Sequence, residues 1–265
     1  MSYCGFVRYL IFAAILARGL AQSSQASKEF DVASVKPSAP DEHNRARMQI
    51  LPGGGIRLLG VPLRMLIMQA YDVKVFQISG GPDWIRTERW DILAKADGVE
   101  GRLTFAQQQP MLQALLADRF QFKVHKETKE MPVYALVVGK NGSKLALSAG
   151  TGDEQQFRTG NGSLSVKNDG VASLADWLSR QLGRTVIDKT DLKGKYDYAL
   201  TWNPDPGEGG SESFGLPPEG PRPHVETDGP SIFTALQEQL GLRLVSQKGP
   251  VEMVVIDSVQ RPSAN

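Results

Sequence analysis

Cysteine is almost absent from this chain. The only one among 265 residues is Cys4, close to the N-terminus. Around it, Arg8 is followed by an apolar run of about nine residues, and Gly19 and Ala21 then form the small-x-small pattern that signal peptidase accepts. We therefore predict a signal peptide over residues 1–21, with a second candidate cleavage point about five residues later. Its removal would leave no thiol, which excludes disulfides, cysteine nucleophiles and thiolate-bound metals.

Long apolar runs and an excess of one charge are also lacking. The apolar run of the predicted signal is much shorter than the roughly 20 residues that span a bilayer, and no later segment approaches that length. We therefore expect a mature chain without a transmembrane segment, located in the periplasm or secreted. The 30 basic and 29 acidic residues leave a net charge of +1. Because nucleic-acid binding depends on a strong positive field, we expect no nucleic-acid partner.

Motifs of metal, nucleotide and nucleophilic chemistry are missing as well. The three histidines, His43, His125 and His224, are far apart in sequence, and no HExxH or Gly-x-Ser-x-Gly pattern occurs. The stretch Gly139–Lys144 lacks the residue order of a P-loop, and we interpret its glycines as turn residues. We expect no metal, no cofactor and no catalytic residues.

An internal repeat is the main positive feature of the sequence. Residues 47–71 have the pattern strand, glycine turn, strand, helix, and residues 156–182 repeat that pattern. An Asp-centred strand follows in each half, around Asp91 and Asp197, and each half then closes with a second helix and a pair of strands. The sequence therefore predicts an α+β fold made of two similar units in tandem, each a small, mostly antiparallel sheet covered by two helices.

The predicted boundaries follow changes in composition. We place the first α+β unit at residues 27–148 and the second at residues 154–265, with a short polar linker between them. Residues 203–230 are rich in proline and glycine, and we interpret them as a flexible insertion in the second unit. A tolerated surface loop is the favoured interpretation, and a functional insertion is the alternative.

The loop Gly80–Trp84 is the best candidate for a binding site. Its glycines and proline restrict the backbone so that Asp83 and Trp84 would present an acid beside an aromatic ring, a pair that can hold a sugar or a peptide. A tryptophan after a rigid turn more often covers the core of its own domain. The favoured interpretation is therefore structural, and Asp83 and Trp84 remain candidate ligand-binding residues.

Carboxylates are the alternative source of chemistry. Asp188, Asp191 and Asp197 cluster in VIDKTDLKGKYD, where Asp191 and Gly194 fit the ends of a type I turn. A structural role is favoured over acid and base catalysis, which needs carboxylates whose environments separate their pKa values.

Five separated motifs, in order, resemble the soil-associated protein family of soil bacteria. They are FDVASVKPS, GGPDW with WDILAKA, LLADRFQFKVHKETKEMPVYALVV, VIDKTDLKGKYDYALTWNPD and ALQEQLGLRLVSQKGPVEMVVIDSVQRPSAN. The resemblance implies an exported domain of unknown function and supplies no catalytic residues. Some members are joined to a membrane-embedded zinc peptidase of the antibiotic-sensor type. This sequence lacks the HExxH of that portion, so peptidase activity is not transferred to it.

Two functions follow as expectations. The first is an exported non-enzymatic binding, sensor or assembly module whose sheet edges or Gly80–Trp84 loop contact an envelope protein, peptide or glycan. The alternative is a hydrolase of envelope or extracellular polymers that uses carboxylates such as Asp83, Asp91 or Asp197. Two carboxyl groups about 5 to 10 Å apart in one cleft would favour the hydrolase, and dispersed carboxyl groups would favour the binding module.

Overall fold

The structure, a computed structural model, describes residues 29–30, 32–39, 46–96, 101–149, 154–205 and 229–262. The predicted signal peptide at residues 1–21 lies outside the described residues. So does most of the predicted insertion at residues 203–230. No helix in the described part of the chain combines the length and apolar character needed to cross a membrane.

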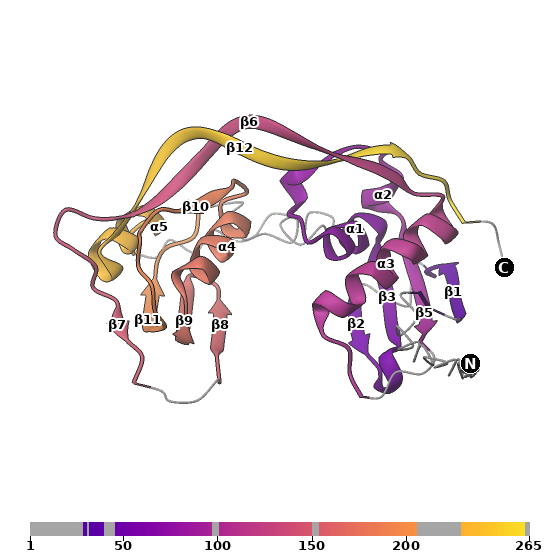
Figure 1. Ribbon diagram of the computed structural model, residues 1–265, viewed down its shortest axis with the longest axis horizontal. Helices are drawn as coiled ribbons and strands as arrows, with labels where there is room; N and C mark the ends of the chain where they lie inside the picture. Colours follow the sequence, from indigo (N-terminus) through magenta and orange to yellow (C-terminus); the bar gives the residue numbers. More distant parts are fainter. Residues whose placement is uncertain are drawn as a thin grey trace, which may run out of the picture.

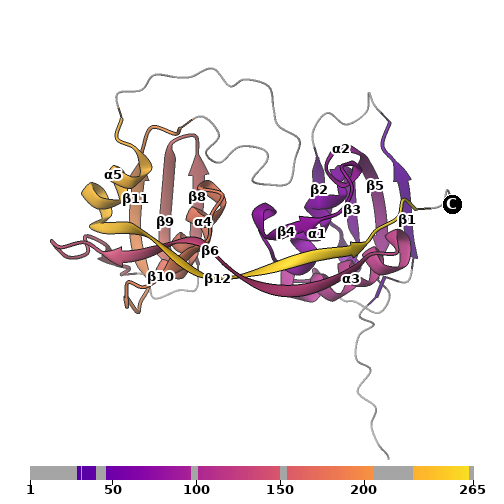
Figure 2. The ribbon, with the colours of Figure 1, turned by 90° about the horizontal axis from the view of Figure 1, so that it is seen from above.

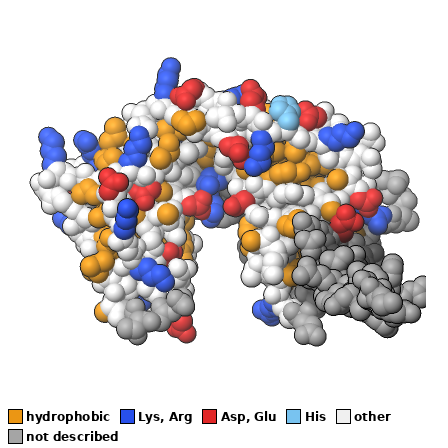
Figure 3. Space-filling view, in the orientation of Figure 1, with side chains coloured by type: hydrophobic (Ala, Val, Ile, Leu, Met, Phe, Trp, Pro, Cys, Tyr) orange, Lys and Arg blue, Asp and Glu red, His pale blue; other side chains and the backbone are white. Residues whose placement is uncertain are grey.

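The fold is α+β, as predicted. The described residues form three four-stranded sheets whose strands are mostly antiparallel. Figure 1 shows two lobes, one built from the early part of the chain and one from the later part, hanging from the ends of a long two-stranded ribbon. The space-filling view is hollowed between the lobes beneath this ribbon, and side chains of both charges are scattered over the visible face (Figure 3).

The first lobe contains a sheet with the strand order β1-β5-β3-β2. Three helices accompany it, and the first of them buries Leu63, Leu66, Ile67 and Ala70, the face that the helical spacing predicts. The elements are β1 (Val32–Pro37), β2 (Arg47–Ile50), β3 (Ile56–Pro62), α1 (Leu63–Tyr71), α2 (Trp84–Thr87), β5 (Arg89–Lys95) and α3 (Phe105–Phe120), with 3-10 turns at Pro52–Gly54 and Val75–Gln77.

The second lobe contains a sheet with the order β7-β11-β9-β8. Along β9, Leu164, Val166 and Asn168 are buried while the residues between them are exposed, the period-two pattern of a strand with one wet face. The elements are β7 (Ala146–Leu147), β8 (Gln156–Gly160), β9 (Ser163–Asp169), α4 (Val171–Gln181), β11 (Tyr196–Thr201), α5 (Ile232–Ala235) and a π-helical turn at Leu236–Leu240.

The third sheet takes two strands from each half of the chain. Its order is β10-β6-β12-β4, and its elements are β4 (Ile78–Gly80), β6 (Lys123–Val138), β10 (Val186–Asp188) and β12 (Leu242–Ser258). β6 and β12 pair antiparallel along nearly their whole length, whereas β10 joins β6 and β4 joins β12 in parallel. The short strand β4 of the early chain therefore pairs with β12, the last strand among the described residues.

This sheet corrects the prediction that each half closes with a pair of strands. Each predicted pair is one long strand, and the two long strands pair with each other across the molecule. In β6, Pro132 lies opposite Lys248 without interrupting the pairing. In β12, Gly249 and Pro250 lie opposite Met131 and Glu130 without interrupting the pairing. Gly249 and Pro250, residues that often mark a turn, therefore form no turn here. Both long strands continue through this point and remain paired.

Each lobe has its own apolar core, and the ribbon contributes to both. Val254 and Ile256 of β12 belong to the core of the first lobe, while Leu136 of β6 and Leu242 of β12 belong to the core of the second. Seen from above, the ribbon runs from one lobe to the other (Figure 2). Burial of these side chains at both ends anchors the ribbon to the lobes.

Candidate functional site

The loop Gly80–Trp84 directs its tryptophan inward. Trp84 is 9% exposed, and its ring meets Trp90 edge-on with centroids 6.3 Å apart. Gly81 has a φ of +80°, and a Cβ there would lie 2.9 Å from Ile256 of β12, so the loop packs closely on the ribbon. The ring of Trp84 is thus part of the first lobe's core, as the structural interpretation of the loop expects.

Asp83 and Trp84 have different surroundings. The Asp83 side chain is 87% exposed and pairs with Arg86. The guanidinium of Arg261 lies 5.0 Å from the centroid of the Trp84 ring and also bonds the carboxylate of Glu88 at 2.6 Å. That hydrogen bond lowers the pKa of Glu88. Any ligand of this loop would have to rely mainly on Asp83, because the core and Arg261 occupy the surroundings of the ring.

Asp91 is a buried acceptor within the first lobe. Its side chain is 5% exposed and accepts hydrogen bonds from the main-chain N–H of Gly60, at 2.9 Å, and from the hydroxyl of Ser38. Gly60 has a φ of +63° and lies where the pairing of β3 with β5 shifts register. Such a bulge leaves an N–H without a strand partner, and Asp91 supplies the acceptor.

Asp197 has the same role in the second lobe. Its carboxylate accepts from the main-chain N–H of Asn168 at 2.8 Å, and Asn168 has a φ of +55° beside a register shift between β9 and β11. This N–H, and after it the hydroxyl of Ser148, lowers the pKa of Asp197. Ser38 follows β1 and Ser148 follows β7, so each serine lies just past an edge strand.

The three carboxylates of the hydrolase alternative do not form one group. Asp91 and Asp197 belong to sheets in different lobes, each bonded within its own bulge (Figure 1). The neighbouring acids have local roles: Asp188, the last residue of β10, accepts from the N–H and hydroxyl of Thr190 at 2.9 and 2.7 Å, and Asp191 has a φ of +58°. These local bonds agree with a structural role for the segment, while the type I turn from Asp191 to Gly194 stays a prediction.

Metal ligands do not gather in the part of the chain that the structure describes. No three His, Cys, Asp or Glu residues there approach closely enough to share an ion. His125 contacts Asp257 across the ribbon at 2.8 Å, and both side chains are about half exposed. His43 and His224 lie outside the described residues.

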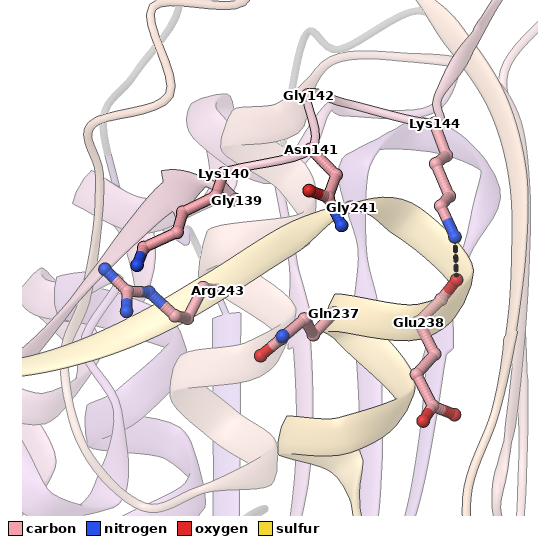
Figure 4. A pocket seen from close by; sticks show the side chains of 9 residues that line it. All are labelled: Gly139, Lys140, Asn141, Gly142, Lys144, Gln237, Glu238, Gly241 and Arg243. Atoms are coloured by element: carbon pink, nitrogen blue, oxygen red, sulfur yellow. Dashed lines mark hydrogen bonds between the residues drawn. The ribbon is translucent and has the colours of Figure 1, made fainter.

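A pocket that the sequence did not predict lies where β6 ends and β12 begins (Figure 4). Its volume is about 450 Å³, within the range of small-ligand sites. Two segments form it, the turn after β6 and the chain around the start of β12. The lining residues are Gly139, Lys140, Asn141, Gly142, Lys144, Gln237, Glu238, Gly241 and Arg243.

Main-chain hydrogen bonds hold these two segments together. The N–H of Gly139 donates to the carbonyl of Gly241 at 2.8 Å, and the N–H of Lys144 donates to the carbonyl of Leu240 at 2.9 Å. Gly241 has a φ of +67°, and a Cβ there would overlap the carbonyl oxygen of Gly142. The pocket therefore depends on a close backbone approach that only glycine permits.

The pocket is positively charged. Lys140, Lys144 and Arg243 line it with a single acid, Glu238. Lys144 donates to the main-chain oxygen of Glu238 at 2.6 Å, while the Glu238 carboxylate points away from the three cations (Figure 4). Lys140 and Arg243 extend toward the same region of the pocket (Figure 4). Within the described residues, neither side chain has an ion-pair or hydrogen-bond partner.

A second hollow, of about 260 Å³, lies between the lobes. Lys74 of the first lobe reaches Asp176 of α4 at 2.6 Å, and Asp176 also pairs with Arg180. The Lys74 side chain is 19% exposed, so this ion pair is partly shielded from water. The contact ties the lobes together beside the ribbon: β10, which pairs with β6, also lines the hollow, and Gln77 donates to the main-chain oxygen of Glu252 in β12.

Sequence reasoning found the turn at Gly139–Lys144 but missed the pocket. The two lysines of this turn are the sequence feature that could have indicated a positively charged site. The other wall comes from a segment almost 100 residues later in the chain, at Gln237–Arg243. Only the pairing of β6 with β12 brings the two together.

Comparison with known proteins gives one finding. No curated protein and no solved structure matches this chain. A family model described as "Protein of unknown function (DUF3738)" matches residues 64–259, which include the second lobe, the ribbon, the pocket and the part of the first lobe from α1 onward, but not strands β1, β2 and β3. The chain therefore belongs to the DUF3738 family of proteins of unknown function.

Proposed function

We propose that this chain is an exported, non-enzymatic binding module that works in sensing or assembly at the cell envelope. Export rests on the signal-like pattern of residues 1–21, and the sensing role rests on the resemblance to proteins joined to membrane peptidases. The partner is an envelope protein, peptide or glycan.

The observation that carries this proposal is the use of Asp91 and Asp197 as bulge acceptors. A general acid or base must exchange protons with a substrate, but these carboxylates already accept hydrogen bonds from the main chain of their own sheets. They also lie in different lobes, so they cannot flank one scissile bond. The hydrolase alternative draws no support from this arrangement.

We also propose that the chain consists of two similar units, residues 27–148 and 154–265. The sheets of the two lobes support the duplication because their orders, β1-β5-β3-β2 and β7-β11-β9-β8, follow the same path through the chain. The edge strand β7 (Ala146–Leu147) belongs to the first unit by these bounds and pairs with β11 of the second. The paired aspartates at equivalent bulges agree with it. Each unit would then lend its last long strand to the sheet that both share.

A retention and cleavage assay tests the binding function. The full chain, purified after export, is immobilised and incubated with labelled envelope polymers, and both retained and released label are followed by size. We expect retention without shortening of the polymer. If the wild type shortens the polymer and Asp197→Asn does not, the chain is a hydrolase instead. Cooperative unfolding of Asp197→Asn is required to show that this variant is folded.

Export is tested separately. Mass spectrometry of the protein recovered from the periplasm or medium should give a chain that begins at Gln22 or, for the later cleavage point, at Ser27. A full-length chain confined to the cytoplasm would overturn the exported location.

A further inference from the structure

We propose that the pocket at the end of the ribbon binds a polyhydroxylated anion, of the kind that uronic acids and sugar phosphates present. The inference rests on the proposed binding function and assigns that function a site and a ligand class. It follows from three features that the pocket has within the described part of the chain: cations without an ion-pair partner, side-chain amides without a hydrogen-bond partner, and a lining without large apolar side chains.

The cations call for an anion. Arg243 and Lys140 reach the same part of the pocket, and no acid neutralises them within the described residues (Figure 4). Like charges held near each other repel, and an anion between them would replace that repulsion with attraction. The guanidinium of Arg243 can give two parallel hydrogen bonds to a carboxylate or a phosphate, with Lys140 as a second positive charge.

The remaining lining favours a ligand with hydroxyl groups. Asn141 and Gln237 face the pocket, and no side-chain partner engages their amides within the described residues. Each amide has both a donor and an acceptor, which a hydroxyl group can use together and a bare anion cannot. The lining contains no aromatic or large aliphatic residue. An apolar peptide side chain or an acyl chain would therefore gain little there.

The pocket is also preorganised. Main-chain hydrogen bonds fix the turn that carries Lys140 and Asn141 against Gly241, two residues before Arg243. The binding groups from both segments thus keep their spacing without a ligand, which reduces the ordering that binding must overcome.

Calorimetric titration of the full exported chain tests the proposal. The probes are trigalacturonate, which carries carboxylates, and glucose 6-phosphate, with maltotriose as the neutral control. We expect at least one anionic probe to bind and maltotriose not to bind. Arg243→Gln should weaken that binding about tenfold or more, and Lys140→Gln should weaken it by a smaller factor. The probe that binds identifies the anion as carboxylate or phosphate.

The matched control is Arg158→Gln, because Arg158 is likewise an exposed strand arginine but lies outside the pocket. Its affinity should equal that of the wild type. The proposal is wrong if neither anionic probe binds, if Arg243→Gln binds as the wild type does, or if Arg158→Gln weakens binding equally. It is also wrong if anionic lipid vesicles, and not the sugars, show the dependence on Arg243.

Failure of this inference differs from failure of the binding function. If Arg243→Gln still retains envelope polymers as the wild type does, the pocket is not the site but the binding module stands. If the wild type retains no envelope material while trigalacturonate still binds through Arg243, the pocket stands and the envelope partner is wrong.

Discussion

The main-chain N–H of Asn168 donates a hydrogen bond of 2.8 Å to the carboxylate of Asp197. Gly60 and Asp91 form the same arrangement in the other lobe at 2.9 Å. In both places a residue with positive φ breaks the register of neighbouring strands, and an aspartate on the next strand satisfies the freed N–H. The repeated Asp-centred strands are therefore explained by folding, without an appeal to catalysis.

Replacing Asp91 should destabilise the protein strongly. Asp91→Ala leaves the N–H of Gly60 and the hydroxyl of Ser38 without this acceptor in a buried site, at a cost of about 2 to 3 kcal/mol. Asp197→Ala should cost less, because Asp197 is only partly buried. Urea denaturation of both variants measures the difference. Equal stability of Asp91→Ala and the wild type would contradict this role.

The Asp197 bond predicts an acid dependence of stability. Because the folded protein holds the pKa of Asp197 below its ordinary value, the ionised form contributes stability above about pH 4. That contribution is lost as the pH falls through the lowered folded pKa. The free energy of unfolding, measured at about pH 7 and about pH 3, should therefore fall less in Asp197→Asn than in the wild type. Ser148→Ala, which removes a second bond to the same carboxylate, should reduce the dependence in the same direction.

Trp84 should prove to be a stability residue. Its ring is buried against Trp90, so Trp84→Ala should cost about 3 to 5 kcal/mol and lower the melting temperature clearly. Asp83→Asn is the matched change in the same loop, and it should leave the melting temperature nearly unchanged because its ion pair with Arg86 is exposed. If Asp83→Asn instead weakens retention of envelope material, the loop binds a ligand through that carboxylate.

The ion pair between Lys74 and Asp176 should restrict movement of the lobes. Spin labels at Gln49→Cys and Arg158→Cys, on exposed positions of β2 and β8, report the distance between the lobes. The predicted absence of other thiols in the mature chain makes this labelling specific. We expect Lys74→Ala to broaden the measured distance distribution, because it removes a partly shielded contact between the lobes.

Lys126→Ala is the control for this measurement. It removes an ion pair with Glu252 that joins the two strands of the ribbon and leaves the contact between the lobes intact. The distribution should then match that of the parent. If the distance distribution of Lys74→Ala is as narrow as that of the doubly labelled parent protein, the ribbon alone sets the position of the lobes.

Local structure was predictable where the hydrophobic pattern is local. The buried face of α1 and the alternation of β9 follow from spacing alone. The pairing of the strands could not be predicted in the same way. An alternation with period two identifies a strand, but it does not say which other strand pairs with it. The apolar residues of β6 and β12 are consistent with two shorter strands that pair within each half. They are equally consistent with the observed pairing of one long strand from each half.

The candidate site illustrates the same limit. The rigid loop sequence predicts that Asp83 and Trp84 present an acid beside an aromatic ring, yet the ring is buried and the acid exposed. Arg243 carried no local signal, because its significance comes from Lys140, which a long-range strand pairing places beside it. A charged site that is assembled from segments far apart in the chain is hard to predict from the residues next to each other in the sequence.

The position of β12 sets the order in which the molecule can be completed. This strand is the last that the structure describes, yet Val254 and Ile256 complete the core of the first lobe, and its end pairs with β4. The core of the first lobe thus remains unfinished until β12 has been synthesised. Under the proposed export, such a delay would keep the emerging polypeptide open while it is threaded through a translocation channel.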